Sequence, residues 1–289
     1  MGRVALGGGA PGSAGVSDTA MDDTDLERRF GGLRRLHGDL AYQRLRRLRL
    51  AVVGLGGVGS WAVEALARSG VAGLVLIDLD HVAESNINRQ VQATSRTLGQ
   101  AKGLALAERL ADIHPGCTAH VVDAFVEPDN WPGLLPGPVD GLIDACDQVR
   151  AKLALAAWAR RTCVPLVCCG AAGGKLRPER LEIDDLAAVT HDPLLASLRN
   201  RLRREQGAPR QGRIGVRCVF SREPVAPPAE VCTSDGSLNC HGYGSSVTVT
   251  ASMGLAAAAE LIRLCLAPQT PKHSSEKHAI VEGSTGKGC

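Results

Sequence analysis

The chain has 289 residues, a formal net charge of +3 at neutral pH, and 44% hydrophobic residues. This length is enough for one large α/β domain or two smaller ones, and the composition is that of a globular protein. The net charge is too small to indicate nucleic-acid binding by itself, although arginines concentrate in residues 28–50 and 198–205.

The cysteine pattern argues for a reduced, cytoplasmic protein. The chain has 10 cysteines, but no two of them form a CxxC pair, which argues against a four-cysteine zinc site. The N-terminal residues lack an apolar stretch of the kind that forms a secretory signal, so we expect free thiols and a cytoplasmic location. Residues 1–23 and 268–289 have polar or small-residue compositions that predict disorder, which leaves 24–267 as one folded domain.

The first half of the chain predicts helices alternating with strands. Apolar spacing predicts a helix over 24–47. It is followed by strands at 48–53, 73–78, 118–124, 139–144 and 164–169, and by helices at 58–69, 98–113 and 148–161. This alternation indicates an α/β fold of the doubly wound, Rossmann-like kind, with a mostly parallel sheet and helices on both faces.

The second half is less regular. Residues 175–187 could form a pair of strands, and Asp192 followed by Pro193 predicts the start of a helix. Residues 206–213 and 222–240 are predicted to be loops. The apolar stretch 245–268 contains Glu260 and Arg263, so a buried core helix is favoured over a membrane span and no stable membrane insertion is expected.

A glycine motif lies between the first predicted strand of the sheet and the helix after it. Gly54, Gly56 and Gly59 fit GxGxxG, a pattern that serves NAD, FAD and ATP alike. Asp78, at the end of the next strand, fits the carboxylate that holds a ribose. The polar residues that follow, Asn86, Arg89 and Lys102, favour an enzyme that stabilises charge on a triphosphate over one that transfers hydride.

The ordered motifs "GLGGVGSW", "LIDLDHVAESNINRQ", "GQAKGLALAERL" and "DACDQVRAK" resemble the adenylating domain of E1-like enzymes, also called the ThiF family, over about residues 28–170. The further motifs "RRFGGLRRLHG", "HDPLLASLRNRL", "VRCVFS" and "NCHGYGSSVTVTASMG" are similar to the tRNA threonylcarbamoyladenosine dehydratase branch, over about 28–266. That branch uses ATP to close the threonylcarbamoyl side chain of adenosine 37 in tRNA into a ring. The resemblance therefore implies carboxylate activation by adenylation, with ATP and Mg²⁺ and with tRNA as the substrate.

The resemblance also implies roles for individual residues. Gly54, Gly56, Gly57 and Gly59 would form the turn that approaches the phosphates, and Ser60 could donate to one of them. Asp78 would hold the ribose, while Asn86, Arg89 and Lys102 would face the phosphates. Asp147 would hold Mg²⁺, and Asp144 is a second candidate that could equally be a structural strand end. Arg35, or alternatively Arg29 or Arg34, would reach the partner's site in a homodimer.

Several interpretations stay open at this point. Cys240 could be a thioester nucleophile with His241 as a base, although an intramolecular attack needs neither, and Cys168 and Cys169 are expected in the core. A sulfurtransferase partner and a monovalent cation near residues 170–174 are further expectations. The alternative functions are an adenylyltransferase for the C-terminal glycine of a ubiquitin-like or sulfur-carrier protein, a nicotinamide-dependent oxidoreductase, and a non-catalytic tRNA-binding scaffold.

Overall fold

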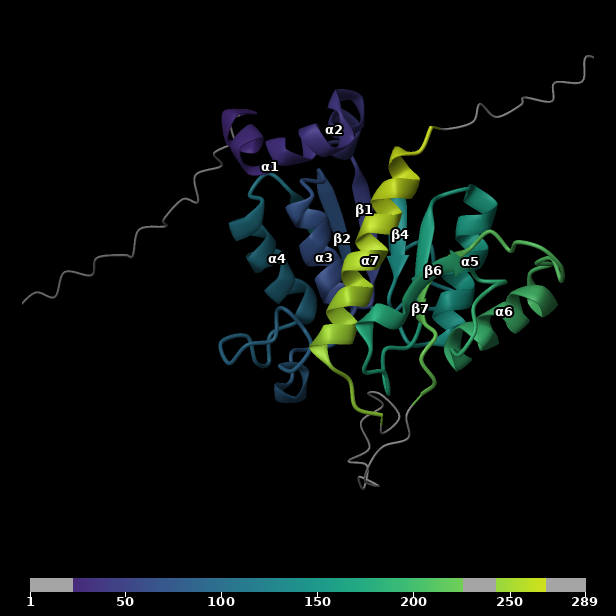
Figure 1. Ribbon diagram of the computed structural model, residues 1–289. Helices are drawn as coiled ribbons and strands as arrows, with labels where there is room; N and C mark the ends of the chain where they lie inside the picture. Colours follow the sequence, from purple (N-terminus) through teal and green to yellow (C-terminus); the bar gives the residue numbers. More distant parts are fainter. Residues whose placement is uncertain (1–22, 226–242, 269–289) are drawn as a thin grey trace, which may run out of the picture.

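The computed structural model describes residues 23–225 and 243–268, and these build one seven-stranded sheet in the order β3-β2-β1-β4-β5-β7-β6 (Figure 1). The strands are β1 (Arg49–Val53), β2 (Gly73–Ile77), β3 (Thr118–Val122), β4 (Gly141–Asp144), β5 (Leu166–Cys169), β6 (Leu181–Asp185) and β7 (Arg217–Ser221). The helices are α1 (Asp23–His37), α2 (Asp39–Leu45), α3 (Gly59–Arg68), α4 (Lys102–Ile113), α5 (Val149–Thr162), α6 (Pro193–Glu205) and α7 (Val247–Leu266), with short 3₁₀ turns at Glu84–Asn86 and Pro178–Arg180.

All strand pairs in the sheet are parallel except β6 with β7. The central strands β1, β2, β4 and β5 are almost wholly buried, because helices cover both faces of a parallel sheet and leave no polar side. The doubly wound α/β fold predicted from the sequence is therefore confirmed. Its nucleotide-binding edge is expected where the parallel strands end, beyond Val53, Ile77 and Asp144.

Successive strand residues point to opposite faces and so divide the core into two layers. On β1, Leu50 and Val52 pack with α3, α4 and α7, whereas Ala51 and Val53 pack with α5 and α6. Figure 1 shows α7 lying along one face of the sheet and α5 beside α6. The two layers fix the starts of α3, α4 and α5 at one edge of the sheet, where the candidate site lies.

The N-terminal helix differs from its prediction. The sequence predicts one helix over 24–47, but the chain forms α1 and α2 with a break at Gly38, whose φ is 80°. Glycine adopts this left-handed conformation without the steric cost that a side chain brings. The apolar spacing continues across the break, which is why the sequence did not reveal it.

One further helix boundary and one strand pairing were predicted wrongly. The helix predicted over 98–113 begins only at Lys102, after a single bridge between His81 and Ala101. The strand pair predicted within 175–187 is one strand, β6, and its antiparallel partner is the distant β7. A hairpin was the simplest local interpretation of this segment, but the hydrogen-bonding partner comes from about 35 residues further along the chain.

The start of α6 and the packing of α7 follow the sequence predictions. The side chain of Asp192 accepts a hydrogen bond from the backbone N–H of Leu195 at 2.9 Å, as an N-cap residue does. Although α7 is long and apolar enough to cross a membrane, it packs against α3 and the sheet, and Glu260 within it pairs with Arg217. The seven cysteines of the described residues are free thiols, and Cys168 and Cys169 lie in the core as expected.

Candidate active site

The glycine turn between β1 and α3 is built by close backbone packing. Gly54 has a φ of 83° and donates its N–H to the carbonyl of Ile77 at 2.9 Å. A Cβ on Gly54 would come within 2.9 Å of the backbone of Ala145, and a Cβ on Gly59 would overlap the carbonyl oxygen of Gly54. Both positions therefore require glycine for structural reasons, because the turn folds back against itself and against the end of β4.

Gly56 is different, because a Cβ there would meet no atom within 4 Å. The packing of this chain therefore does not require glycine at this position, and the backbone is open on that side. At Gly57 a Cβ would come within about 3.0 Å of Thr250 and 3.3 Å of Arg89. Ser60 is fully buried and its Oγ accepts from the N–H of Val91 at 3.4 Å, so the hydroxyl packs toward the 86–92 segment.

Asp78 ends β2 and faces the glycine turn. One carboxylate oxygen accepts from the N–H of Leu55 at 2.6 Å and the other from the N–H of Asp80 at 2.8 Å. Burial raises the pKa of Asp78, and the nearby ammonium of Lys102 opposes that shift. The carboxylate thus holds the turn in place while lying at the edge where a ribose is bound in this fold.

Lys102 starts α4 and is buried, with its Nζ paired to Asp80 at 2.7 Å. Its own backbone N–H also bonds to the carbonyl of Asp80 at 3.0 Å. Asp80 was missed in the sequence analysis, although it lies only two residues after Asp78 in "LIDLD". The sequence did contain a signal for Asp80, namely the second acidic residue of this motif, because a buried lysine needs a partner of opposite charge.

Asn86 and Arg89 lie together in the segment that follows. Asn86 is buried and its side-chain oxygen accepts from the N–H of Ala83 at 3.0 Å, which stabilises the 3₁₀ turn. The Arg89 guanidinium donates to the carbonyl of Ser85 at 2.6 Å. The backbone carbonyl of Arg89 accepts from the indole N–H of Trp61 at 2.9 Å. The structure thus places Arg89 beside Gly57, at the glycine turn.

Asp144 ends β4 inside the core, with the partners that the structural interpretation of this residue predicts. It is fully buried and pairs with the equally buried Nζ of Lys152 at 3.1 Å. The thiols of Cys146 and Cys168 donate to its two oxygens at 3.0 and 3.1 Å. Lys152 was not singled out in the sequence, because a lysine on an apolar helix usually lies at the surface.

Asp147 projects from the loop between β4 and α5 and is exposed. Within the described part of the chain, its carboxylate forms no hydrogen bond or ion pair. It therefore lies at the edge of the sheet, near the glycine turn that packs against Ala145, with its carboxylate open to a ligand.

Arg35 lies apart from these residues. It belongs to α1, which together with α2 lies at the opposite end of the sheet from the glycine turn (Figure 1). Arg29 donates to the carbonyl of Ile113 at 2.9 Å, and Arg34 is paired with Glu27 and Asp39. Arg35 alone of the three makes no hydrogen bond or ion pair with a described residue. Cys240 and His241 fall outside the described residues.

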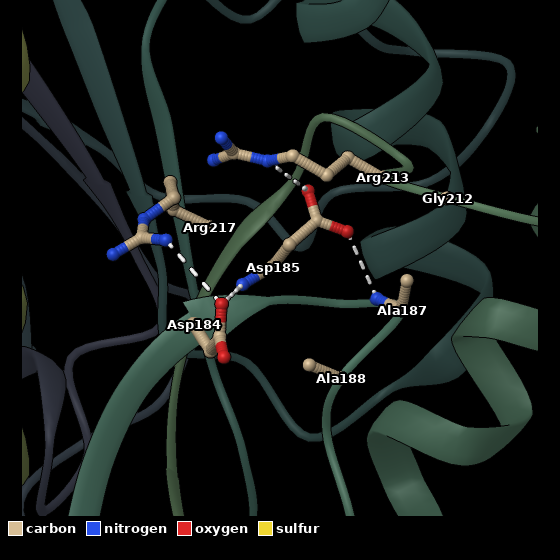
Figure 2. Close-up of a pocket in the computed structure, with 7 residues that line it drawn as sticks. All are labelled: Asp184, Asp185, Ala187, Ala188, Gly212, Arg213 and Arg217. Carbon is tan, nitrogen blue, oxygen red and sulfur yellow. Dashed lines mark hydrogen bonds and ion pairs between the residues drawn. The ribbon is translucent and has the colours of Figure 1, made fainter.

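A pocket of about 490 Å³ lies beside β6 and β7, around Asp185 and Arg217 (Figure 2). Asp185 accepts from the N–H groups of Ala187, Ile214 and Gly215 at 2.8–2.9 Å. Burial would raise the pKa of Asp185, but these backbone N–H groups outweigh it and lower the pKa. The Asp185 carboxylate is thus occupied in holding together the loops at 187 and 214–215.

A glycine turn after the first strand of a parallel sheet, an acidic residue ending the next strand and a helix starting at the turn together define a nucleotide-binding α/β protein. The chain belongs to the ThiF family, whose sequence model matches residues 28–284. The resemblance to the E1-like adenylating family is thereby confirmed.

The chain is also similar to individual proteins of this family. The chain is 42% identical to the tRNA threonylcarbamoyladenosine dehydratase of Escherichia coli, over 83% of this chain and 94% of the relative. A crystal structure of that E. coli enzyme in complex with ATP superposes with a TM-score of 0.76 at 41% identity, covering 83% of this chain and 94% of the other. The molybdopterin-synthase adenylyltransferase of Salmonella typhimurium is 37% identical, but over only 43% of this chain and 50% of the relative.

Proposed function

We propose that this protein is an ATP-dependent tRNA threonylcarbamoyladenosine dehydratase, which adenylates the carboxylate of the threonylcarbamoyl group and thereby closes it into a ring. The observation that carries the proposal is the extent of similarity: the E. coli dehydratase matches 83% of the chain, including the second half beyond the nucleotide-binding strands. The ATP complex of that relative supports ATP as the nucleotide.

The residues at the sheet edge suit this reaction. A carboxylate is a poor electrophile. Transfer of AMP from ATP to the carboxylate releases pyrophosphate, and AMP is then the leaving group when a nucleophilic atom of the same threonylcarbamoyl group attacks the carbonyl and closes the ring. Gly56 leaves the backbone open for a phosphate, and the N-terminus of α3 points its N–H groups toward the same place. Arg89 and Lys102 supply positive charge near the triphosphate, and Asp78 is placed to accept from the ribose hydroxyls.

Mg²⁺ fits this site only together with the nucleotide. No group of three or more His, Cys, Asp or Glu side chains that could hold a metal occurs among the described residues. Mg²⁺ is commonly held by one or two carboxylates together with substrate phosphates, which matches the single open carboxylate of Asp147. When bound there, the ion would neutralise charge on the reacting phosphates.

The proposed function also includes a second subunit, a sulfurtransferase and a monovalent cation. We propose a homodimer in which Arg35 enters the site of the other subunit, because α1 lies far from the glycine turn of its own chain. A sulfurtransferase partner and a cytoplasmic location are kept as predictions. A monovalent cation near residues 170–174 is also kept, although the ammonium of Lys175 already donates to the carbonyl of His191 at 3.1 Å beside that segment.

The second candidate is an adenylyltransferase acting on the C-terminal glycine of a carrier protein. It is favoured by the 37% identity to the S. typhimurium enzyme, but that match is confined to less than half of the chain. The chain also lacks the CxxC pairs expected of a zinc-bearing activator of sulfur carriers.

Exchange of radiolabelled pyrophosphate into ATP separates the candidates. We expect exchange that is stimulated by tRNA carrying threonylcarbamoyladenosine, with loss of one water from that nucleoside detected by mass spectrometry. Unmodified tRNA is the matched control. Exchange stimulated only by a protein ending in Gly-Gly would favour the second candidate, and binding of NAD more tightly than ATP would exclude both.

A further inference from the structure

A groove lies between α5, α6 and the segment before β4, on the face of the sheet away from α7. Its volume is about 180 Å³, and its walls include Arg150, Ala154, Ala157 and Arg161 of α5, Arg201 of α6, and Trp131. The α5 residues are spaced three or four apart and so form one stripe along the helix. We call this feature the α5–α6 groove.

The α5–α6 groove is positively charged. Three arginines line it, and no carboxylate is among its lining residues. Arg201 is paired with Glu205 through two contacts of 3.1 Å. The guanidinium groups of Arg150 and Arg161 make no hydrogen bond or ion pair with any described residue, so their donors are free for an anion.

The floor of the groove is apolar and well packed. Trp131 is 8% exposed and makes an edge-to-face contact with Trp158, with ring centroids 5.3 Å apart. Leu153 and Ala157 of α5 are also buried. The arginines are therefore carried by a helix whose position is fixed by its core contacts, which reduces the entropy lost when a ligand binds.

Arg150 lines one end of the α5–α6 groove and is close in the chain to the candidate active site. Arg150 lies in the first turn of α5, three residues after Asp147. Arg161 lies in the last turn, and its separation of 11 positions from Arg150 corresponds to roughly 16 Å along the helix axis. The groove thus leads away from the nucleotide-binding edge over a distance longer than one phosphodiester unit.

We propose that the α5–α6 groove binds a stretch of the tRNA phosphodiester backbone beside the nucleotide whose base is modified. The proposal rests on the dehydratase function above, which supplies a polyanionic substrate, and it names the surface that holds this substrate. Guanidinium groups bind phosphate through two parallel hydrogen bonds, and such contacts position a nucleic acid without reading its sequence. An acidic protein is the competing occupant.

The test uses Arg161→Gln and the double variant Arg150→Gln/Arg161→Gln in the full-length protein. Both side chains are exposed, so the changes should leave the fold intact. We expect the Kd for tRNA carrying threonylcarbamoyladenosine to rise about tenfold for each arginine removed, because a charge-assisted hydrogen bond is lost each time. The dependence of log Kd on log salt concentration should fall by about one for each variant position.

Arg47→Gln is the matched control. Arg47 is an exposed arginine between α2 and β1, and its guanidinium has no hydrogen bond or ion pair with a described residue. It should leave the affinity for tRNA and the salt dependence unchanged. The KM for ATP should be the same in Arg161→Gln as in the wild type, because Arg161 lies at the far end of α5 from the nucleotide edge.

The outcomes are distinguishable. Unchanged tRNA affinity and salt dependence in the double variant would overturn the groove proposal and favour an acidic protein as its occupant, while the dehydratase function stands. A wild-type protein that neither binds nor dehydrates threonylcarbamoylated tRNA would instead remove the proposed function. An equal loss of affinity in Arg47→Gln would show general electrostatic attraction rather than a groove, and would also overturn the proposal.

Discussion

Gly56 and Gly59 belong to the same turn but are glycines for different reasons. We expect Gly59→Ala to destabilise the protein severely, because its methyl group would overlap the carbonyl oxygen of Gly54. Gly56→Ala should fold with a melting temperature close to the wild type, because its Cβ enters open space. If that space receives a phosphate, Gly56→Ala should weaken ATP binding about tenfold or more, as calorimetry would show. Unchanged ATP affinity in Gly56→Ala would place the phosphates elsewhere.

Asp147 is the open carboxylate at the sheet edge, so its removal should affect chemistry rather than folding. We expect Asp147→Ala to lower the rate of tRNA dehydration by on the order of a hundredfold or more, because charge on the phosphates is no longer balanced in the site. Mass spectrometry of nucleosides from treated tRNA measures this rate. Cys240→Ala is the comparison and should cost about tenfold at most, roughly 1.4 kcal/mol of barrier.

A Cys240→Ala protein as inactive as Asp147→Ala, with a normal melting temperature, would contradict direct attack within the substrate. A thioester or sulfur-relay mechanism would then become the better account of the reaction.

The start of α5 is anchored to the end of β4 by a buried ion pair. Asp144 and Lys152 are both fully buried, and the Lys152 ammonium also donates to the carbonyl of Cys169 at 2.8 Å. Burial lowers the pKa of Lys152, but the Asp144 carboxylate outweighs this and holds the pKa well above its usual value. This pair fixes the two ends of the loop that carries Asp147.

Lys152→Met should therefore lower the free energy of unfolding by about 3–5 kcal/mol, because it leaves the Asp144 carboxylate buried without a partner. The double variant Asp144→Asn/Lys152→Met removes both charges and should recover much of that loss. Urea unfolding measures both values. Equal stability of Lys152→Met and the wild type would mean that the loop opens to solvent.

The contact between α1 and the end of α4 predicts a dependence of stability on pH. His114 packs on Phe30 with ring centroids 4.7 Å apart, and neither of its buried nitrogens has a hydrogen-bond partner among the described residues. Burial, aided by the charges of Arg46 and Arg29, lowers the pKa of His114 from 6.5 to about 4. The unfolded chain thus binds a proton between these values that the folded protein excludes.

The contribution of neutral His114 to the free energy of unfolding is fully present above about pH 6.5, and it is lost as the pH falls toward 4. We expect the melting temperature to decline over this window, and His114→Phe to reduce the decline because phenylalanine keeps the packing but does not titrate. If the melting temperatures of the wild type and of His114→Phe decline equally from pH 7 to 4.5, His114 is not the source of the pH dependence.

The elements differ in how well the sequence predicted them, and the reason is the range of the interactions that fix them. Local patterns were enough for α6, whose cap Asp192 lies beside the helix it starts, and for the apolar strands of the parallel sheet. The partnership of β6 with β7 and the buried pair of Asp144 with Lys152 depend on residues brought together only by the fold. The motifs thus predicted a candidate site at the ends of the parallel strands, but Asp80 emerged as the partner of Lys102 only from the structure.

At the level of the whole molecule, the position of α1 separates Arg35 from the glycine turn of its own chain. If Arg35 completes the site of a partner subunit, two inactive proteins should restore each other. In a mixed dimer of Arg35→Ala with Asp147→Ala, the site of the Arg35→Ala subunit keeps its own Asp147 and receives Arg35 from the other subunit. The second site lacks both residues and stays inactive.

Co-expression of Arg35→Ala with Asp147→Ala should therefore recover about a quarter of the wild-type activity, since random pairing makes half of the dimers mixed and each of these has one intact site. Purification through two different tags isolates the mixed dimer and should raise the recovery to about half of the wild-type activity per dimer. Arg29→Ala and Arg34→Ala are the controls, because both arginines are engaged within their own chain. Arg35 acting within one chain would give no recovery, since each subunit would then lack one required residue. A monomer by light scattering with full activity would exclude the exchange altogether.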